Sequence, residues 1–348
     1  MRGGVVRTVL GDVPAGELGA TYAHEHLILD NALIEAAFPH IHLPDVDAAV
    51  NEVGSCAEAG VRAMVDAMPC AAGRDVVRLA EVSRRTGVHV VAATGLHHRR
   101  YYGPTHWSAR VQPEELGRLF AEDVLIGVDA FDYTGPLVRR TGHRAGLIKI
   151  ATGGERLDAR DGLLVAAAGL AHRASGAPVL THCEGGRGGV EQIAALERAG
   201  VPPEVVVLSH VDKVVDPGYH RELVGSGATV EYDQTLRRAS DPEHATIGLI
   251  TALLADGYGD RIVLGTDGAR RDLWKTLGGA PGLAWLATGF RERLAAAGIG
   301  ETDLRRLYVD NPSGVLALRP ADPAILGLQA TGGNQPIAES SHTPKHLT

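Results

Sequence analysis

The stretch Thr21-Tyr-Ala-His-Glu-His-Leu-Ile-Leu-Asp30 decides how the rest of the chain is interpreted. It is an apolar run interrupted by His24 and His26, which is typical of a buried β-strand. Side chains of a strand alternate between its faces, so these two imidazoles point the same way and are close enough to share one metal ion. The pattern alone is weak, because chance gives about 0.7 such pairs in this sequence. A second pair, His40-Ile-His42, lies between two prolines and is interpreted as loop.

Composition excludes several classes of protein. The 348 residues carry a formal charge of −8 with the two signs interspersed, which predicts neither a nucleic-acid groove nor an anionic membrane surface. Three cysteines form no disulfide framework and fit a reducing compartment. We see no secretory signal at the N-terminus and no apolar run of transmembrane length. We therefore expect a cytoplasmic protein that acts on a small molecule, without nucleic-acid or membrane partners.

The chain alternates short apolar strands with helical segments. Strands are predicted at residues 21–29, 61–68, 88–95, 146–151, 178–183, 204–210, 229–233 and 261–266. Helices are predicted at 45–59, 74–86, 113–129, 159–175, 189–199, 217–224, 241–255, 282–297 and 301–308. Near-continuous apolar strands alternating with helices predict a parallel sheet covered by helices, and eight such units predict a (β/α)8 TIM barrel. A doubly wound open sheet is the alternative, but no glycine-rich fingerprint follows the first strand.

The two ends of the chain are expected to differ from this pattern. Residues 5–20 predict a lead-in hairpin, with Gly11-Asp-Val-Pro14 as its turn. After residue 319 the sequence becomes rich in Gly, Pro, Ser and Thr. We therefore predict one hydrolase barrel over residues 1–319 and a flexible C-terminal tail over 320–348.

Polar residues stand at the carboxyl ends of the predicted strands, where barrels of this kind hold their active sites. Besides the first pair of histidines they are Lys149, His182, His210 and Asp267. Singly, each histidine is more often a hydrogen-bonded core residue and an aspartate can cap a helix, whereas a buried unpaired lysine is costly. Together they indicate a metal centre, and imidazole with carboxylate suits zinc, manganese, cobalt or iron.

These motifs resemble the phosphotriesterase-like family of the amidohydrolase superfamily. The similarity covers about residues 5–318 and rests on the His24-Glu-His26 strand, the Lys149 strand, Thr-His182-Cys-Glu, Leu-Ser-His210-Val-Asp-Lys and Asp267. The resemblance implies a distorted (β/α)8 barrel with two divalent metals, zinc first among the candidates, and relatives suggest a homodimer. It puts His24, His26 and Asp267 on one metal and His182 and His210 on the other. Lys149 would bridge them as a carbamate formed with CO2.

The reaction that the resemblance implies is metal-assisted hydrolysis. The metals would lower the pKa of a bridging water and polarise the substrate oxygen. Asp267 would accept the proton of that water and deliver it to the leaving oxygen. A non-catalytic metal- or ligand-binding barrel is the alternative of another class, and the presence of the ligands together with Asp267 argues against it.

The loops after the last two strands suggest the substrate. They are basic, and barrels often hold phosphate in these loops. The alternative is that these are solvated charges paired with nearby aspartates. The second loop is similar to the subgroup that hydrolyses phosphorylated sugar lactones, and this puts Arg237, Arg270 and Lys275 on the distal phosphate. Tyr101, after the third strand, is a further candidate for substrate contact, with packing at the rim as its alternative.

We therefore predict a metal-dependent lactonase acting on a phosphorylated or otherwise anionic sugar lactone. A phosphotriesterase/arylesterase or an amide hydrolase with the same two metals is the alternative within the enzyme class.

Overall fold

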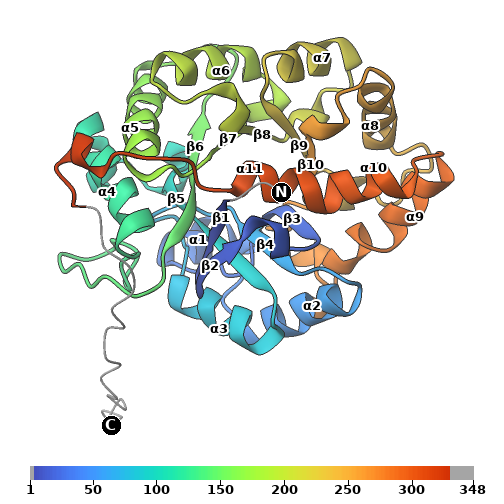
Figure 1. Ribbon diagram of the computed structural model, residues 1–348. Helices are drawn as coiled ribbons and strands as arrows, with labels where there is room; N and C mark the ends of the chain where they lie inside the picture. The colour runs from blue at the N-terminus through green and yellow to red at the C-terminus, as the bar shows by residue number, and fades with distance from the viewer. Residues whose placement is uncertain (1–3, 330–348) are drawn as a thin grey trace, which may run out of the picture.

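A computed structural model describes residues 4–329 and shows eight parallel strands in one sheet, ordered β3 to β10 as in the chain (Figure 1). Backbone N–H groups of Thr266 and Asp267 donate to the carbonyl of His24, at 3.1 and 3.0 Å, so the segment after the last strand meets the first strand. The predicted (β/α)8 TIM barrel is confirmed as a nearly closed barrel. Its strands are β3 Thr21–Glu25, β4 Ala63–Asp66, β5 His89–Leu96, β6 Ala145–Thr152, β7 Val179–Cys183, β8 Val206–Ser209, β9 Thr229–Tyr232 and β10 Ile262–Leu264.

Helices surround the strands on the outside of the barrel (Figure 1). Asp45, Asp75 and Asp158 begin three of them by accepting a backbone N–H three residues further on. The predicted helices are present, and two short ones, α1 and α11, were not predicted. The helices are α1 Ala32–Ala37, α2 Val46–Glu58, α3 Val76–Thr86, α4 Pro113–Leu125, α5 Ala159–Ser175, α6 Gly189–Arg198, α7 Pro217–Gly225, α8 Ala245–Ala255, α9 Gly289–Ala296, α10 Glu301–Arg305 and α11 Asn311–Leu316.

The lead-in hairpin is present, but its turn was predicted at the wrong place. β1 (Val5–Thr8) and β2 (Gly11–Pro14) pair antiparallel, so residues 11–14 form a strand and the turn is at 9–10. The Thr8 hydroxyl closes this turn, because it accepts the N–H of Leu10 at 3.3 Å and donates to the carbonyl of Gly11 at 2.7 Å. The Thr8 side chain therefore forms the turn, and not the Gly11-Asp-Val-Pro14 sequence.

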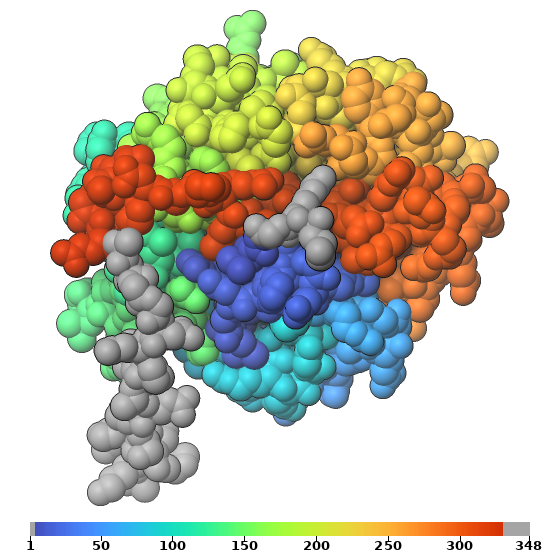
Figure 2. Space-filling model, viewed as in Figure 1, coloured from blue at the N-terminus to red at the C-terminus, as the bar shows by residue number. Residues whose placement is uncertain are grey.

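The hairpin and the C-terminal segment cover the amino end of the barrel. They lie side by side in Figure 2, where the hairpin is blue and the C-terminal segment red, and Leu318 donates to the carbonyl of Val5 at 2.9 Å. Val6, Leu18, Val315 and Leu316 join one buried cluster with the inward-facing residues of the strands. Because this end is packed with apolar side chains, the carboxyl ends of the strands are left for polar chemistry.

The boundary predicted after residue 319 stays a prediction. Up to residue 329 the segment packs on α5, where Arg319 donates to Gly176 and Asp322 to Arg173, and Leu326 is buried. Residues 330–348 of the predicted tail lie outside the described residues. Within residues 4–329, no helix combines the length and apolarity that crossing a membrane requires.

Candidate metal centre

The barrel brings the six predicted ligands together at the carboxyl ends of its strands. His24, Lys149 and His182 belong to β3, β6 and β7. The other three, His26, His210 and Asp267, follow β3, β8 and β10. The four histidines and Lys149 are buried, and the side chain of Asp267 is 15% exposed. Segments far apart in the sequence thus place these side chains in one space.

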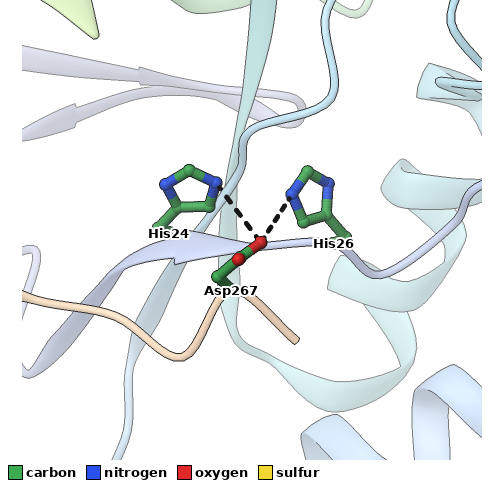
Figure 3. A group of neighbouring side chains, drawn as sticks. All are labelled: His24, His26 and Asp267. Carbon is green, nitrogen blue, oxygen red and sulfur yellow. Dashed lines mark ion pairs between the residues drawn. The ribbon is translucent and has the colours of Figure 1, made fainter. Parts of the chain in front are cut away.

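His24, His26 and Asp267 form one of three groups of potential metal ligands among the described residues (Figure 3). Oδ1 of Asp267 lies 3.5 Å from Nε2 of His26 and 3.9 Å from Nε2 of His24. Three ligands held tetrahedrally at about 2.1 Å from one metal lie about 3.4 Å apart. Nδ1 of His26 is buried and has no hydrogen-bond partner within residues 4–329. The donor types and their spacing therefore fit a zinc-like ion.

His182, His210 and Lys149 lie beside this group. The rings of His182 and His210 are 4.4 Å apart between centroids, and the ring of His210 is 5.0 Å from that of His24. Nζ of Lys149 donates to the hydroxyl of Ser209 at 3.2 Å. The structure thus places all six predicted residues in one buried cluster.

Burial favours the neutral form of three of the imidazoles, those of His24, His182 and His210, and metal binding requires neutral rings. It lowers the pKa of His24 and His210 well below the usual range. It also lowers the pKa of His182 to about 4, although Glu184 opposes the shift by accepting from its Nε2 at 2.8 Å. Burial opposes the ionisation of Asp267, but the Arg237 guanidinium and the contact with His26 hold its pKa well below the usual range. Neutral nitrogen donors thus surround one ionised carboxylate.

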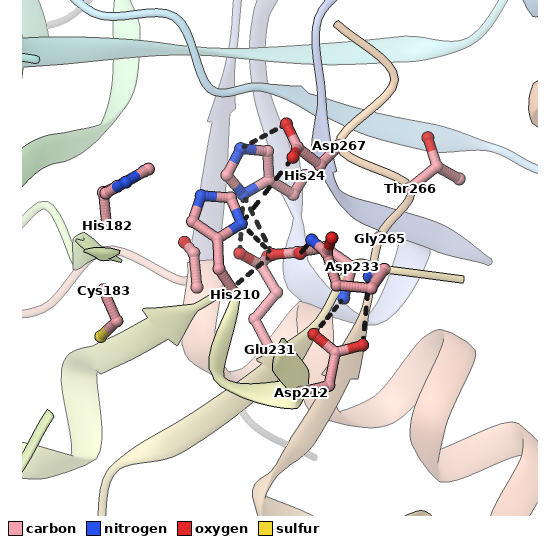
Figure 4. Close-up of polar contacts among 12 residues, drawn as sticks. His24, His182, Cys183, His210, Asp212, Glu231, Asp233, Gly265, Thr266 and Asp267 are labelled. Carbon is pink, nitrogen blue, oxygen red and sulfur yellow. Dashed lines mark hydrogen bonds and ion pairs between the residues drawn. The ribbon is translucent and has the colours of Figure 1, made fainter. Parts of the chain in front are cut away.

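Two buried acids, Glu231 and Asp233, lie beneath the histidines and were not predicted to act in the site (Figure 4). Oε2 of Glu231 is 2.8 Å from Nδ1 of His24, and Oδ2 of Asp233 accepts the backbone N–H of His210 at 2.8 Å. The two acids are two residues apart at the end of an apolar strand, as are His24 and His26 at the end of β3, and this spacing could have indicated them.

Arg237 reaches the candidate metal centre, but its guanidinium faces Asp267. Its Nη2 donates to the backbone carbonyl of Asp267 at 2.8 Å and lies 3.0 Å from Oδ2 of the same residue. Its Nη1 donates to the carbonyl of Thr266 at 3.1 Å. The Arg237 guanidinium is therefore held against the segment that carries Asp267.

The other candidates for substrate contact lie further out. Arg270 is exposed and pairs with Asp272 two residues away, as expected of a solvated loop charge. Lys275 packs against Gly282. The ring of Tyr101 lies 4.5 Å from that of His97, which lies 5.1 Å from that of His182. Tyr101 therefore borders the candidate metal centre through His97.

Comparison with known proteins places the chain in a family. The sequence profile described as "Phosphotriesterase family" matches residues 4–316. This chain belongs to the phosphotriesterase family. The resemblance predicted from the sequence motifs is thereby confirmed, and family membership makes the protein a hydrolase. Enzymes of this family depend on metals, which agrees with the ligand groups described above.

Several known proteins are similar to this chain over nearly its whole length. Phospho-furanose lactonases of Mycoplasmopsis agalactiae and Mycoplasmopsis synoviae are 30% and 29% identical over 321 residues, covering 90% and 89% of this chain and 91% of each relative. The crystal structure of an amidohydrolase from Mycoplasma synoviae superposes with a TM-score of 0.88 at 27% identity, covering 94% of this chain and 96% of that one. A lactonase from Listeria monocytogenes gives a TM-score of 0.83 at 26% identity, covering 91% and 100%.

Proposed function

We propose that the protein is a metal-dependent lactonase that opens an anionic sugar lactone, with phosphorylated furanolactones as the favoured class. The observation that carries the chemistry is the buried group of His24, His26 and Asp267, whose spacing fits one metal. The substrate class is supported by the relatives named phospho-furanose lactonases and by the cations after β9 and β10.

His24, His26 and Asp267 would hold one divalent metal, and His182 and His210 a second, with zinc as our first choice. When bound, the metals supply Lewis acidity toward the lactone carbonyl and lower the pKa of a water. Asp267 then acts as the proton carrier: it accepts a proton from the attacking water and delivers it to the ring oxygen that leaves. Arg237 holds the Asp267 carboxylate in place through the contacts described above.

Lys149 would supply an oxygen ligand to the metals after reaction with CO2. Burial lowers the pKa of Lys149 to about 8, which provides a neutral amine near physiological pH. The nitrogen of the neutral amine forms a bond to the carbon of CO2, one C=O π bond opens to give the carboxylate, and the nitrogen releases one proton to solvent, so a neutral amine becomes an anionic carbamate. The hydroxyl of Ser209, on β8, accepts a hydrogen bond from this amine at 3.2 Å and so positions it.

A substitution of Arg270 tests the substrate class, because its side chain is exposed and its ion pair is with Asp272, two residues away. Matched furanolactones with and without a phosphate would be compared in the wild type and in Arg270→Ala. We expect the KM for the phosphorylated lactone to rise about tenfold, with little change for its unphosphorylated analogue. Arg221→Ala, which removes a similar surface ion pair on α7, is the matched control. Equal effects on both substrates would contradict a phosphate role for Arg270.

A further inference from the structure

Glu231, near the end of β9, and Asp233, the residue after that strand, have no role in the proposed reaction. Side chains two apart on a strand point to the same side, and here both acids are fully buried under the metal-ligating histidines (Figure 4). Glu231 lies closest to a ligand ring, with Oε2 2.8 Å from Nδ1 of His24. Because a buried carboxyl group is costly to keep away from water, this contact must offset part of that cost.

The contact bears on which ring nitrogen of His24 carries the proton. A neutral imidazole has one N–H donor and one nitrogen lone pair, and an oxygen of the Glu231 carboxyl group can accept a hydrogen bond from that N–H. With the proton on Nδ1 directed at Glu231, the lone pair is on Nε2. Nε2 is the atom that lies 3.9 Å from Oδ1 of Asp267, on the side of the proposed metal. The hydrogen bond therefore selects the form of His24 that can bind a metal there.

We propose that Glu231 is a positioning residue that keeps the proton of His24 on Nδ1 and so presents Nε2 to the metal. This inference rests on the metal centre of the proposed function. It concerns how one ligand is oriented, since outer carboxylates of this kind fix the tautomer and ring angle of metal-binding histidines.

Neighbouring groups do not duplicate this role. Nδ1 of His26 has no hydrogen-bond partner in the described part of the chain, so only one of the paired histidines is held in this way. Glu25, although adjacent to His24 in sequence, faces the other side of β3 and accepts the N–H of Thr266 at 3.0 Å. Asp233 lies 3.9 Å from Nδ1 of His24, beyond hydrogen-bonding distance.

Two variants of Glu231 separate orientation of His24 from the presence of a buried charge. In Glu231→Gln the amide oxygen can still accept from Nδ1–H, whereas Glu231→Ala removes the acceptor. We would measure zinc affinity of each metal-stripped protein by competition with a chelator. We expect one of the two zinc affinities to fall about 10- to 100-fold in the alanine variant and to change less than about threefold in the glutamine variant.

Glu52→Ala is the matched control for loss of a buried glutamate. Glu52 is 2% exposed and accepts the backbone N–H groups of Thr276 and Leu283, at 3.0 and 2.8 Å. We expect it to lower the temperature of unfolding without changing zinc affinity. Unchanged zinc affinity in Glu231→Ala, or an equal loss in Glu52→Ala, would overturn the proposal while leaving the lactonase function intact.

Nitrogen-15 NMR of the histidine rings shows directly, in the wild-type protein, which ring nitrogen carries the proton. In the wild-type protein we expect a proton on Nδ1 of His24, protected from exchange with solvent, both before and after zinc is added. His24 is assigned by the signal lost in His24→Asn. A proton on Nε2 of His24 in the metal-free protein would overturn the role of Glu231. A wild-type protein that binds no zinc would overturn the metal centre on which it rests.

Discussion

Asp267 is the residue at which the interactions of the site meet. Its backbone N–H donates to His24, its Oδ1 faces both paired histidines, and its Oδ2 faces Arg237. Its φ of +46° is uncommon for a residue other than glycine, and such conformations persist only where surrounding contacts maintain them. Three sets of contacts thus fix the position of the Asp267 carboxylate.

Asp267→Asn tests the role of this carboxylate in proton transfer. The amide keeps the shape and an oxygen donor but loses the charge and the basicity. We expect kcat to fall by a factor on the order of 10²–10⁴ while most of the bound metal is retained, measured by turnover and by metal analysis. Full activity in this variant would contradict the mechanism.

Arg237→Met tests whether Arg237 acts through Asp267 or on the substrate. Because the guanidinium contacts the backbone and the carboxylate of Asp267, we expect kcat to fall about 10- to 100-fold on phosphorylated and unphosphorylated lactones alike. Steady-state kinetics on the matched pair measures this. An effect limited to the KM of the phosphorylated lactone would instead support the phosphate contact predicted from the sequence.

The ionisation of Lys149 predicts how the rate of its reaction with CO2 changes with pH. Only the neutral amine reacts with CO2, and with a pKa of about 8 its fraction rises from about 1% at pH 6 to about half at pH 8. We expect the rate of CO2-dependent reactivation of metal-stripped protein, at fixed dissolved CO2, to rise about 50-fold between pH 6 and pH 8 and by no more than about twofold above pH 8. A rate that keeps rising tenfold per unit to pH 10 would show an unshifted lysine.

The sequence pointed to the six candidate ligands, which the structure brings together, but not to the residues that contact them. His24, His182 and Asp267 could be found because a polar residue at the end of an apolar run is costly to bury unless it has a specific partner. Glu231 and Arg237 lie in a stretch where every second residue is polar, so their partners follow only from how β9 meets β3 and β10. The contacts of Arg237 with Asp267 could not be derived from spacing, because 30 residues separate the two.

At the level of elements, all eight barrel strands could be predicted, because strands buried on both faces are near-continuously apolar. The short helices α1 and α11 were missed. They have only six residues each, too few for a helical period to be recognised. The hairpin turn was misplaced because Gly11 and Pro14 suggest a turn, whereas the hydrogen bonds of Thr8 form it two residues earlier.

A substitution at Gly95 tests the close pairing of β5 with β6, which is the strand that carries Lys149. Gly95 pairs with Lys149, has a φ of +107°, and a Cβ at this position would lie 1.9 Å from the Lys149 carbonyl oxygen. We expect Gly95→Ala to lower the free energy of unfolding by about 3 kcal/mol or more, measured by urea denaturation. Gly103→Ala is the control, because Gly103 shares the positive φ but has open space around it, and we expect a loss of about 1 kcal/mol. Equal losses in both variants would contradict a steric role at Gly95.

The whole molecule is a barrel with one apolar end and one polar end. The hairpin and α11 fill the amino end with apolar side chains, and the histidines, Lys149 and Asp267 gather at the carboxyl end. Because strands from the full length of the barrel contribute to this end, the site exists only when the barrel is assembled. Metal binding is therefore expected to stabilise the fold as a unit.

Hydrolysis by the metal-stripped and the metal-reconstituted protein, followed by proton release, tests the central claim most directly. The substrates would be matched furanolactones with and without a phosphate, an acyl-homoserine lactone, an aryl phosphotriester and an amide. We predict that turnover depends on added metal and is fastest on the phosphorylated lactone. Turnover of only the neutral substrates would contradict the substrate class and favour the arylesterase or amide-hydrolase alternative. The absence of turnover on every substrate, with two metals bound, would contradict the lactonase function itself.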